Sequence, residues 1–167
     1  MKERPDEALT DANDPHDLRR FVDAQSSNYD QALSEIRAGR KRTHWMWYVF
    51  PQYDGLGRSP AAQRYSIKSV AEADAYLRHS VLGPRLLQCA EAVLDVEGRT
   101  AHAIFGSPDD AKLRSSATLF SRVASPGSAF HRILDRCFAG QPDRRTLELI
   151  EAGSPMDDHR GGTRGPT

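Results

Sequence analysis

The chain has 167 residues, of which 38% are hydrophobic, enough for one hydrophobic core but too few for two independent ones. Its 23 basic residues balance its 23 acidic residues, which argues against binding of nucleic acid or a membrane surface through bulk charge. No segment is apolar for long enough to span a membrane, and no N-terminal basic stretch precedes an apolar run. We therefore expect a soluble, cytoplasmic protein with neither nucleic acid nor membrane as a partner.

Both ends of the chain lack the periodic apolar residues that could offset the entropy lost on ordering. Residues 1–14 are mainly polar, and residues 152–167 are rich in glycine and proline. We predict a disordered N-terminal tail over 1–14, one helical domain over 15–151, and a disordered C-terminal tail over 152–167. No internal repeat or linker divides the central domain.

The first part of the domain carries two helical patterns and one aromatic run. Apolar positions at helical spacing predict helices over 18–25 and 29–36, and Gly39 would end the second as a left-handed C-cap. The run 45–50 is too short to show a period. A helix is favoured there because the sequence offers no second strand for pairing.

Two further helices are predicted in the middle of the chain. Ser69 and Glu72 have the spacing of a capping box, which opens a helix that continues to residue 77. Ser80 then restarts the chain into the apolar positions of 82–94, the best candidate for a core helix.

Three helices end the domain. Ser107 is predicted as the N-cap of a helix over 108–123, with a proline first and acidic residues at the positive end of the helix dipole. The stripe over 130–138 is closed by Gly140, and a short last helix follows Asp143. The predicted fold is therefore all-α, a compact single-domain helical bundle of about six to eight helices.

The two cysteines, Cys89 and Cys137, lie among apolar neighbours at helical spacing. No CxxC pair or Cys/His cluster has the spacing of metal ligands. We expect free, buried thiols, no bound metal and no cofactor.

One segment departs from the composition of an ordinary helix bundle. Residues 40–52 contain both tryptophans and the motif HWMWYVFPQ, and a glycine-containing loop follows over 54–59. Further characteristic positions are Tyr65-Ser66-Ile67, Glu72-Ala73, Tyr76-Leu77, Phe105-Gly106, Asp110, Lys112-Leu113 and Ser115 to Phe120.

Together these residues resemble the bacterial family catalogued as domain of unknown function 1810, also called calpastatin-like hypothetical proteins. The resemblance spans about residues 16–150, and the HWMWYVFPQ run is its most specific part. It implies an all-helical fold, but it implies no established activity.

Residues 44–47 combine a titratable group with aromatic side chains. His44 could act as an acid, a base or a ligand contact near neutral pH. The structural alternative, a packed histidine bonded to a helix end, is favoured because the sequence supplies no obvious partner. Trp45 and Trp47 could stack on a base or simply belong to an aromatic core.

The polar candidates also have two interpretations each. Arg42, within a basic run, would suit a phosphate in a pocket, although successive charges on a turn usually face solvent. The loop 55–59 could offer backbone amides to an anion, or it could be a turn that needs positive φ. Lys112, Ser115 and Ser116 share a helical face as Ser/Lys chemistry requires, but in reverse order, and helical serines more often bond the preceding turn.

Our main hypothesis is a pocket formed where residues 44–52 meet the helix of residues 112–120. It would bind a small anionic, nucleotide-like ligand, with hydrolase or glycosidase activity as an extension. The candidate ligand-binding residues are Arg42, His44, Trp45, Trp47, Gln52, Lys112, Ser115 and Ser116. The alternative is a non-catalytic protein-interaction module with exposed aromatic surface, and the sequence leaves open both enzymatic activity and oligomeric state.

Overall fold

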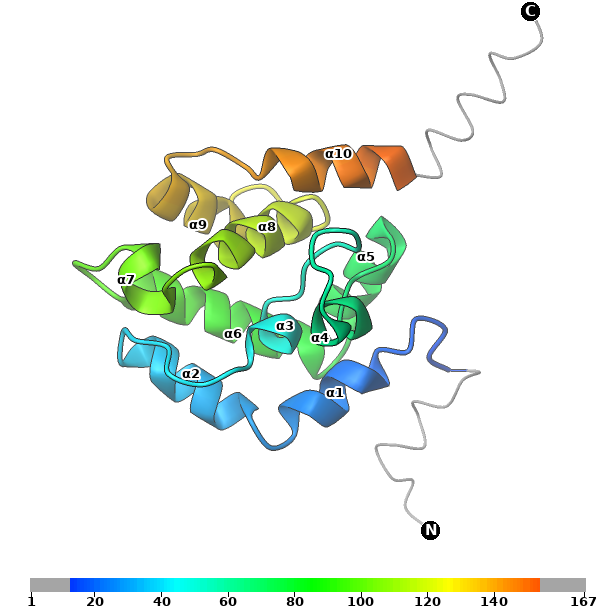
Figure 1. The fold of residues 1–167 in the computed structure, drawn as a ribbon, viewed down its shortest axis with the longest axis horizontal. Helices are drawn as coiled ribbons and strands as arrows, with labels where there is room; N and C mark the ends of the chain where they lie inside the picture. The colour runs from blue at the N-terminus through cyan, green and yellow to red at the C-terminus, as the bar shows by residue number, and fades with distance from the viewer. Residues whose placement is uncertain (1–12, 154–167) are drawn as a thin grey trace, which may run out of the picture.

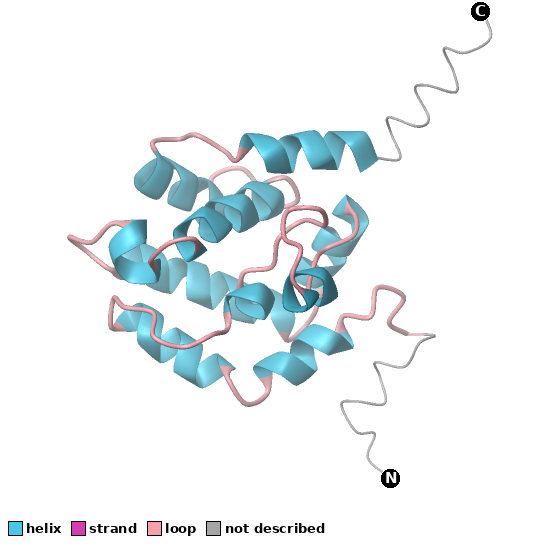
Figure 2. Cartoon of the chain, in the orientation of Figure 1, coloured by secondary structure: helices cyan, strands magenta, loops and turns pink. Residues whose placement is uncertain are grey.

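The computed structural model of the chain describes residues 13–153. The predicted tails, 1–14 and 152–167, therefore lie almost wholly outside the described residues. Residues 13–153 form ten helices and one isolated bridge, between Tyr53 and Ile67. Figure 1 shows how the helices are arranged, and Figure 2 shows that loops connect them without any strand in this part of the chain. The helices are α1 (Arg19–Gln25), α2 (Tyr29–Arg37), α3 (Met46–Val49), α4 (Pro60–Arg64), α5 (Val70–Arg78), α6 (Leu82–Asp95), α7 (Ala101–Phe105), α8 (Asp109–Ser121), α9 (Ala129–Phe138) and α10 (Arg144–Gly153).

The predicted all-α class is confirmed, but the helices outnumber the six to eight expected. The additional ones are α4 and α7, each five residues long, which is too short to show a 3.6-residue apolar period. The N-cap residues Ser59 and Thr100 are the features of the sequence that indicate these two helices. Ser59 accepts a hydrogen bond from the Ala62 N–H, and Thr100 accepts one from the Ala103 N–H.

The capping box at the start of α5 is confirmed with a small variation. The Ser69 hydroxyl oxygen accepts the Glu72 N–H at 3.0 Å, as expected for an N-cap. The Glu72 carboxylate reaches back to the N–H of Lys68, one residue before the cap, at 2.9 Å. Both groups thus satisfy backbone donors that the helix itself leaves unpaired.

The helix predicted to follow Ser80 is found as α6, whereas the N-cap predicted at Ser107 is wrong. The first N–H groups of α6 are taken by the His79 ring, whose Nδ1 accepts from Val81 at 3.0 Å and from Leu82 at 3.2 Å. Before α8 the N-cap position is Pro108, and the Asp110 carboxylate takes the Ala111 N–H at 2.8 Å. At the start of α8 an ionised carboxylate, a stronger acceptor, has thus taken the place of the Ser107 hydroxyl.

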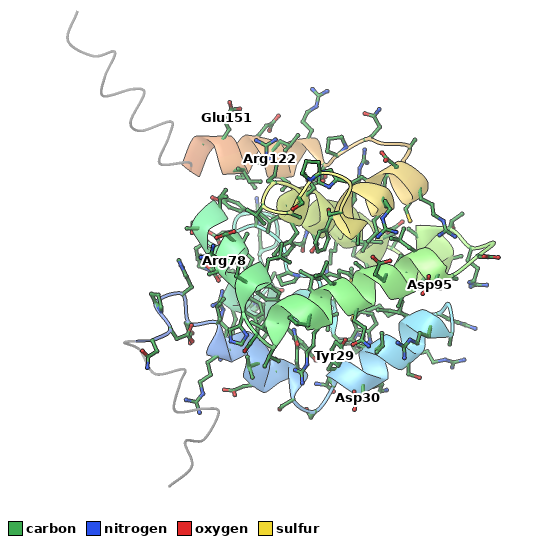
Figure 3. The ribbon with its side chains drawn as sticks, turned by 180° about the vertical axis from the view of Figure 1, so that it is seen from behind. Tyr29, Asp30, Arg78, Asp95, Arg122 and Glu151 are labelled. Carbon is green, nitrogen blue, oxygen red and sulfur yellow. The ribbon has the colours of Figure 1, made fainter. Side chains whose placement is uncertain are left out.

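Helix α6 packs against α2, α5 and α9. Seen from behind in Figure 3, it crosses the fold and ends at Asp95. Helix α8 packs against α5, α7, α9 and α10. A chain of aromatic rings connects α1, α5, α8 and α9. The centre of the Tyr76 ring lies 5.0 Å from that of Phe21 and 5.4 Å from that of Phe120, and the Phe120 and Phe130 ring centres are 5.6 Å apart.

A buried carboxylate, that of Glu35 in α2, holds the segment that leads into α3. It accepts the Arg42 N–H at 2.8 Å, the Thr43 hydroxyl at 2.7 Å and N–H at 3.1 Å, and the Trp45 indole N–H at 2.8 Å. Burial alone would raise the pKa of Glu35, but these hydrogen bonds lower it from 4.5 to about 2. The ionised form is therefore the one that the fold requires.

This network predicts acid-dependent stability. Because the folded pKa lies below the ordinary value of 4.5, the ionised carboxylate stabilises the native state fully above that pH. The contribution, roughly 3 kcal/mol, is lost as the pH falls from 4.5 toward 2. Replacing Glu35 with glutamine should lower the free energy of unfolding at pH 7 by roughly 2–4 kcal/mol and flatten this pH dependence.

Chemical denaturation between pH 3 and 7 measures both effects. The matched control is Glu97→Gln, which removes an exposed carboxylate and should leave the pH profile unchanged. Equal pH profiles for the wild-type protein and Glu35→Gln would contradict the assignment.

Candidate functional site

A groove of about 380 Å³ opens between α3, α4 and the N-terminal ends of α8 and α10. Figure 1 shows the four helices that surround it. Its lining combines apolar, cationic and hydrogen-bonding side chains. The lining residues are Trp47, Gln52, Leu56, Gly57, Arg58, Ser59, Ala62, Pro108, Ala111, Lys112, Ser115, Asp143 and Arg145.

The loop between α3 and α4 lies close to its neighbours because of two glycines. A Cβ on Gly57 would lie 2.5 Å from the Ala62 Cβ, closer than real side chains approach. Gly55 has a φ of +105° and faces Leu149 of α10. The loop also carries Arg58 to the groove. The prediction of a turn that needs positive φ therefore holds for Gly55 but not for Gly57, where close packing against Ala62 is the reason for a glycine.

Lys112 lies at the wall of the groove between an aromatic ring and a carboxylate. Its Nζ is 5.1 Å from the centre of the Trp47 ring and 3.4 Å from Asp109 Oδ1. The other oxygen of Asp109 pairs with Lys41 at 2.8 Å, and Lys41 lies 4.9 Å from the Trp45 ring. Asp109 thus does more than favour the dipole of α8, because it links two lysine–tryptophan pairs.

Three hydroxyl and carboxyl groups form a hydrogen-bonded chain beside the groove. The Ser115 hydroxyl lies 3.0 Å from the Thr146 hydroxyl, which donates to Asp143 Oδ2 at 2.5 Å. The same Asp143 oxygen accepts the Thr146 N–H at 2.9 Å and so caps α10. Because Thr146 uses its hydrogen toward Asp143, Ser115 is the donor in the first bond.

The groove is electropositive and holds polar groups that the protein does not satisfy. Three cationic side chains line it, those of Arg58, Lys112 and Arg145, against the one carboxylate of Asp143. Within residues 13–153, neither the Arg58 guanidinium nor the Gln52 amide has a hydrogen-bond or ion-pair partner. These donors are available to a bound molecule.

The structure brings four of the eight sequence candidates together in this groove: Trp47, Gln52, Lys112 and Ser115. It places the other four elsewhere. The side chains of Arg42 and His44 are exposed and do not line the groove. Trp45 is 1% exposed and bonded to Glu35, so it belongs to the core.

Ser116 is also buried, and its hydroxyl has no hydrogen-bond partner within the described part of the chain. Neither interpretation offered for His44 describes its position, because the ring is neither packed in the core nor directed into the groove. The basic run 40–42 sends only Lys41 toward this region, where it pairs with Asp109.

Sequence reasoning missed Arg58, Asp143 and Arg145 as lining residues. Arg58 belongs to the loop 55–59, whose backbone amides are considered as an anion site, but the Arg58 side chain is not among the candidates. The sequence predicts Asp143 only as a helix start, a role that it does fill. No local pattern links these positions to the groove, since Arg58 is distant in sequence from Asp143 and Arg145, and all three are distant from Lys112.

Both cysteines of the chain lie in the described part. Both cysteines are free, with Cys89 buried and Cys137 partly buried. Burial raises the pKa of Cys89 to about 12, so its thiol is unreactive. Residues 13–153 contain no group of three or more His, Cys, Asp and Glu side chains placed to hold a metal, and no helix among them could cross a membrane.

Comparison with known proteins identifies the family. Residues 15–150 match the family model described as protein of unknown function, DUF1810, and the chain belongs to that family. It is 53% identical to the conserved hypothetical protein Rv1873 from Mycobacterium tuberculosis, whose solved structure gives a TM-score of 0.81. That match covers 82% of this chain and 98% of the other. No curated protein matches the chain.

The site geometry predicts that the two tryptophans respond differently to ionic quenchers. Trp47 lies in a cationic groove, whereas Trp45 is sealed in the core. In Trp45→Phe, which retains Trp47, iodide should quench the fluorescence more strongly than caesium does, because the groove attracts anions. In Trp47→Phe, which retains Trp45, neither ion should quench appreciably.

Quenching by neutral acrylamide serves as the control for simple exposure. Circular dichroism confirms that each variant is folded before the comparison. Equal iodide quenching of both variants, or stronger quenching of Trp47 by caesium, would refute the described groove.

Proposed function

We propose that this member of the DUF1810 family binds a small anionic ligand, such as a nucleotide, in the groove of Trp47 and Lys112. The observation that carries the proposal is the convergence of Arg58, Lys112 and Arg145 on one concave site. They come from α10, α8 and the loop before α4, segments that are far apart in the sequence. A phosphate or carboxylate placed among them gains charge-assisted hydrogen bonds.

The pairing of these cations leaves capacity for a ligand. Arg58 is unpaired within the described residues, and Arg145 makes an exposed contact of 3.5 Å with Glu148. Lys112 shares Asp109 with Lys41, which holds the shorter of the two contacts at 2.8 Å. An incoming anion would therefore strengthen, not replace, the ion pairing of Lys112.

The remaining lining fits a ligand with a planar or apolar part. Trp47, Leu56 and Pro108 supply apolar surface, and the Gln52 amide can donate and accept hydrogen bonds. A volume of about 380 Å³ lies within the range of small-molecule sites. Because Lys112 covers one face of the Trp47 ring, we expect the ligand's anion above that ring and its planar part beside it.

Hydrolase or glycosidase chemistry remains an extension of this proposal. Glycoside hydrolysis ordinarily uses two carboxylates, and Asp143 is the one carboxylate among the lining residues. The proposal is therefore one of binding.

The alternative, a protein-interaction module with exposed aromatic surface, has less support. Among the residues that the structure describes, Leu87 is the one large hydrophobic residue that is exposed, with 39% of its area accessible. A single exposed leucine is ordinary for a protein surface.

Calorimetric titration and thermal shift with nucleoside 5′-monophosphates and sugar phosphates test the proposal. We expect binding that weakens as the salt concentration rises, because the attraction is electrostatic. At a ligand concentration about 100 times Kd, binding should stabilise the fold by about 2.7 kcal/mol. Replacing Lys112 or Arg58 with methionine should weaken binding by about ten-fold or more.

The matched control is Arg122→Met, which removes an exposed arginine just after α8 and away from the groove (Figure 3). This variant should bind as the wild-type protein does. Absence of binding by every phosphorylated compound, or unchanged affinity in Lys112→Met and Arg58→Met, would reject the proposal.

A further inference from the structure

The carboxylate of Asp143 stands out in a groove that otherwise favours anions. One of its oxygens, Oδ2, accepts both the N–H and the hydroxyl of Thr146. Over residues 13–153, the other oxygen, Oδ1, accepts no hydrogen bond and lies within ion-pair distance of none of the cations that line the groove. Asp143, which lines the groove, thus keeps one acceptor oxygen without a partner among these residues.

Neighbouring groups hold this carboxylate in place. The Asp143 N–H donates to the Thr118 hydroxyl at 2.8 Å, which ties the residue to α8. On its other side, Ser115 donates to Thr146, which donates to Asp143. The acceptor is therefore preorganised by both α8 and α10.

The negative charge of Asp143 repels an anionic ligand that has no hydrogen-bond donor to place against it. The arrangement favours a ligand that carries, next to its anionic group, a hydrogen-bond donor for Oδ1. An ammonium group would meet repulsion from Arg58, Lys112 and Arg145, whereas a neutral hydroxyl would not.

We propose that the groove selects a phosphorylated sugar, free or within a nucleotide, whose hydroxyls donate to Asp143 Oδ1 while its phosphate pairs with the cations. This inference rests on the proposed function and names the chemical class of its ligand. It gives Asp143 a role in specificity and gives Ser115 and Thr146 the role of positioning it.

The test compares inorganic phosphate, ribose 5-phosphate and a nucleoside 5′-monophosphate with its 2′,3′-dideoxy analogue, each titrated by calorimetry. The wild-type protein should bind ribose 5-phosphate about ten-fold or more tightly than inorganic phosphate, and the dideoxy analogue should bind about ten-fold more weakly than its parent. If ribose 5-phosphate and the nucleotide bind equally tightly, the free sugar phosphate contains everything that the groove recognises. If the nucleotide binds more tightly, the groove also recognises the base. Either result supports a phosphorylated sugar as the ligand class.

The informative variant is Asp143→Asn. Because Thr146 donates two hydrogen bonds, the amide oxygen must take the Oδ2 position, which leaves an NH₂ donor where Oδ1 was. Binding of ribose 5-phosphate should fall by about ten-fold, and binding of inorganic phosphate should hold or improve, because a negative charge has been removed. Asp143→Ser, which also keeps an N-cap residue, should give the same divergence if the asparagine variant proves unstable.

Glu151→Gln is the control, since it removes an exposed carboxylate from the same helix (Figure 3). If the Asp143 variants change the affinities for both compounds in parallel, the hydroxyl contact is refuted while anion binding stands. If neither phosphate nor sugar phosphate binds the wild-type protein, the proposed function fails first, and this inference fails with it.

Discussion

The buried carboxylate of Glu35 is the interaction on which the arrangement of this protein depends. It is the shared acceptor for two backbone N–H groups, a hydroxyl and the Trp45 indole. Without it the buried Trp45 indole N–H would lose its partner, at a cost of about 1–3 kcal/mol. By fixing Trp45 inside, it sets the orientation of α3, so that Met46 and Val49 enter the core and Trp47 reaches the groove.

A second buried charge, the Arg20 guanidinium, plays the same part at the other side of the molecule. It donates to the carbonyls of Arg64 at 2.7 Å and Ser66 at 2.8 Å, and to the Glu72 carboxylate at 2.7 Å. It also donates to the carbonyls of His16 and Asp17, just before α1. A buried charge so fully bonded joins segments that are distant in sequence and disfavours other registers of packing.

The groove differs from these two networks in what it leaves unsatisfied. The hydrogen-bonding groups of Glu35 and Arg20 are satisfied by partners within the protein, so few of them are available to a ligand. The groove instead exposes the Arg58 guanidinium, the Gln52 amide and one oxygen of Asp143 without partners among the described residues. Open capacity beside rigid support is what separates a binding site from a structural network.

The sequence by itself determined the helical class, the longer helices and several of their ends, because apolar period and capping act within a few residues. It also singled out Trp47, from the aromatic and basic composition of residues 40–52, and Lys112, from its helical spacing to Ser115 and Ser116. Only the tertiary structure decided that Trp45 is core, that His44 lies outside the groove, and that Arg58 and Asp143 lie within it. Those outcomes depend on how α3, α8 and α10 pack, and such long-range contacts leave no periodic trace in the chain.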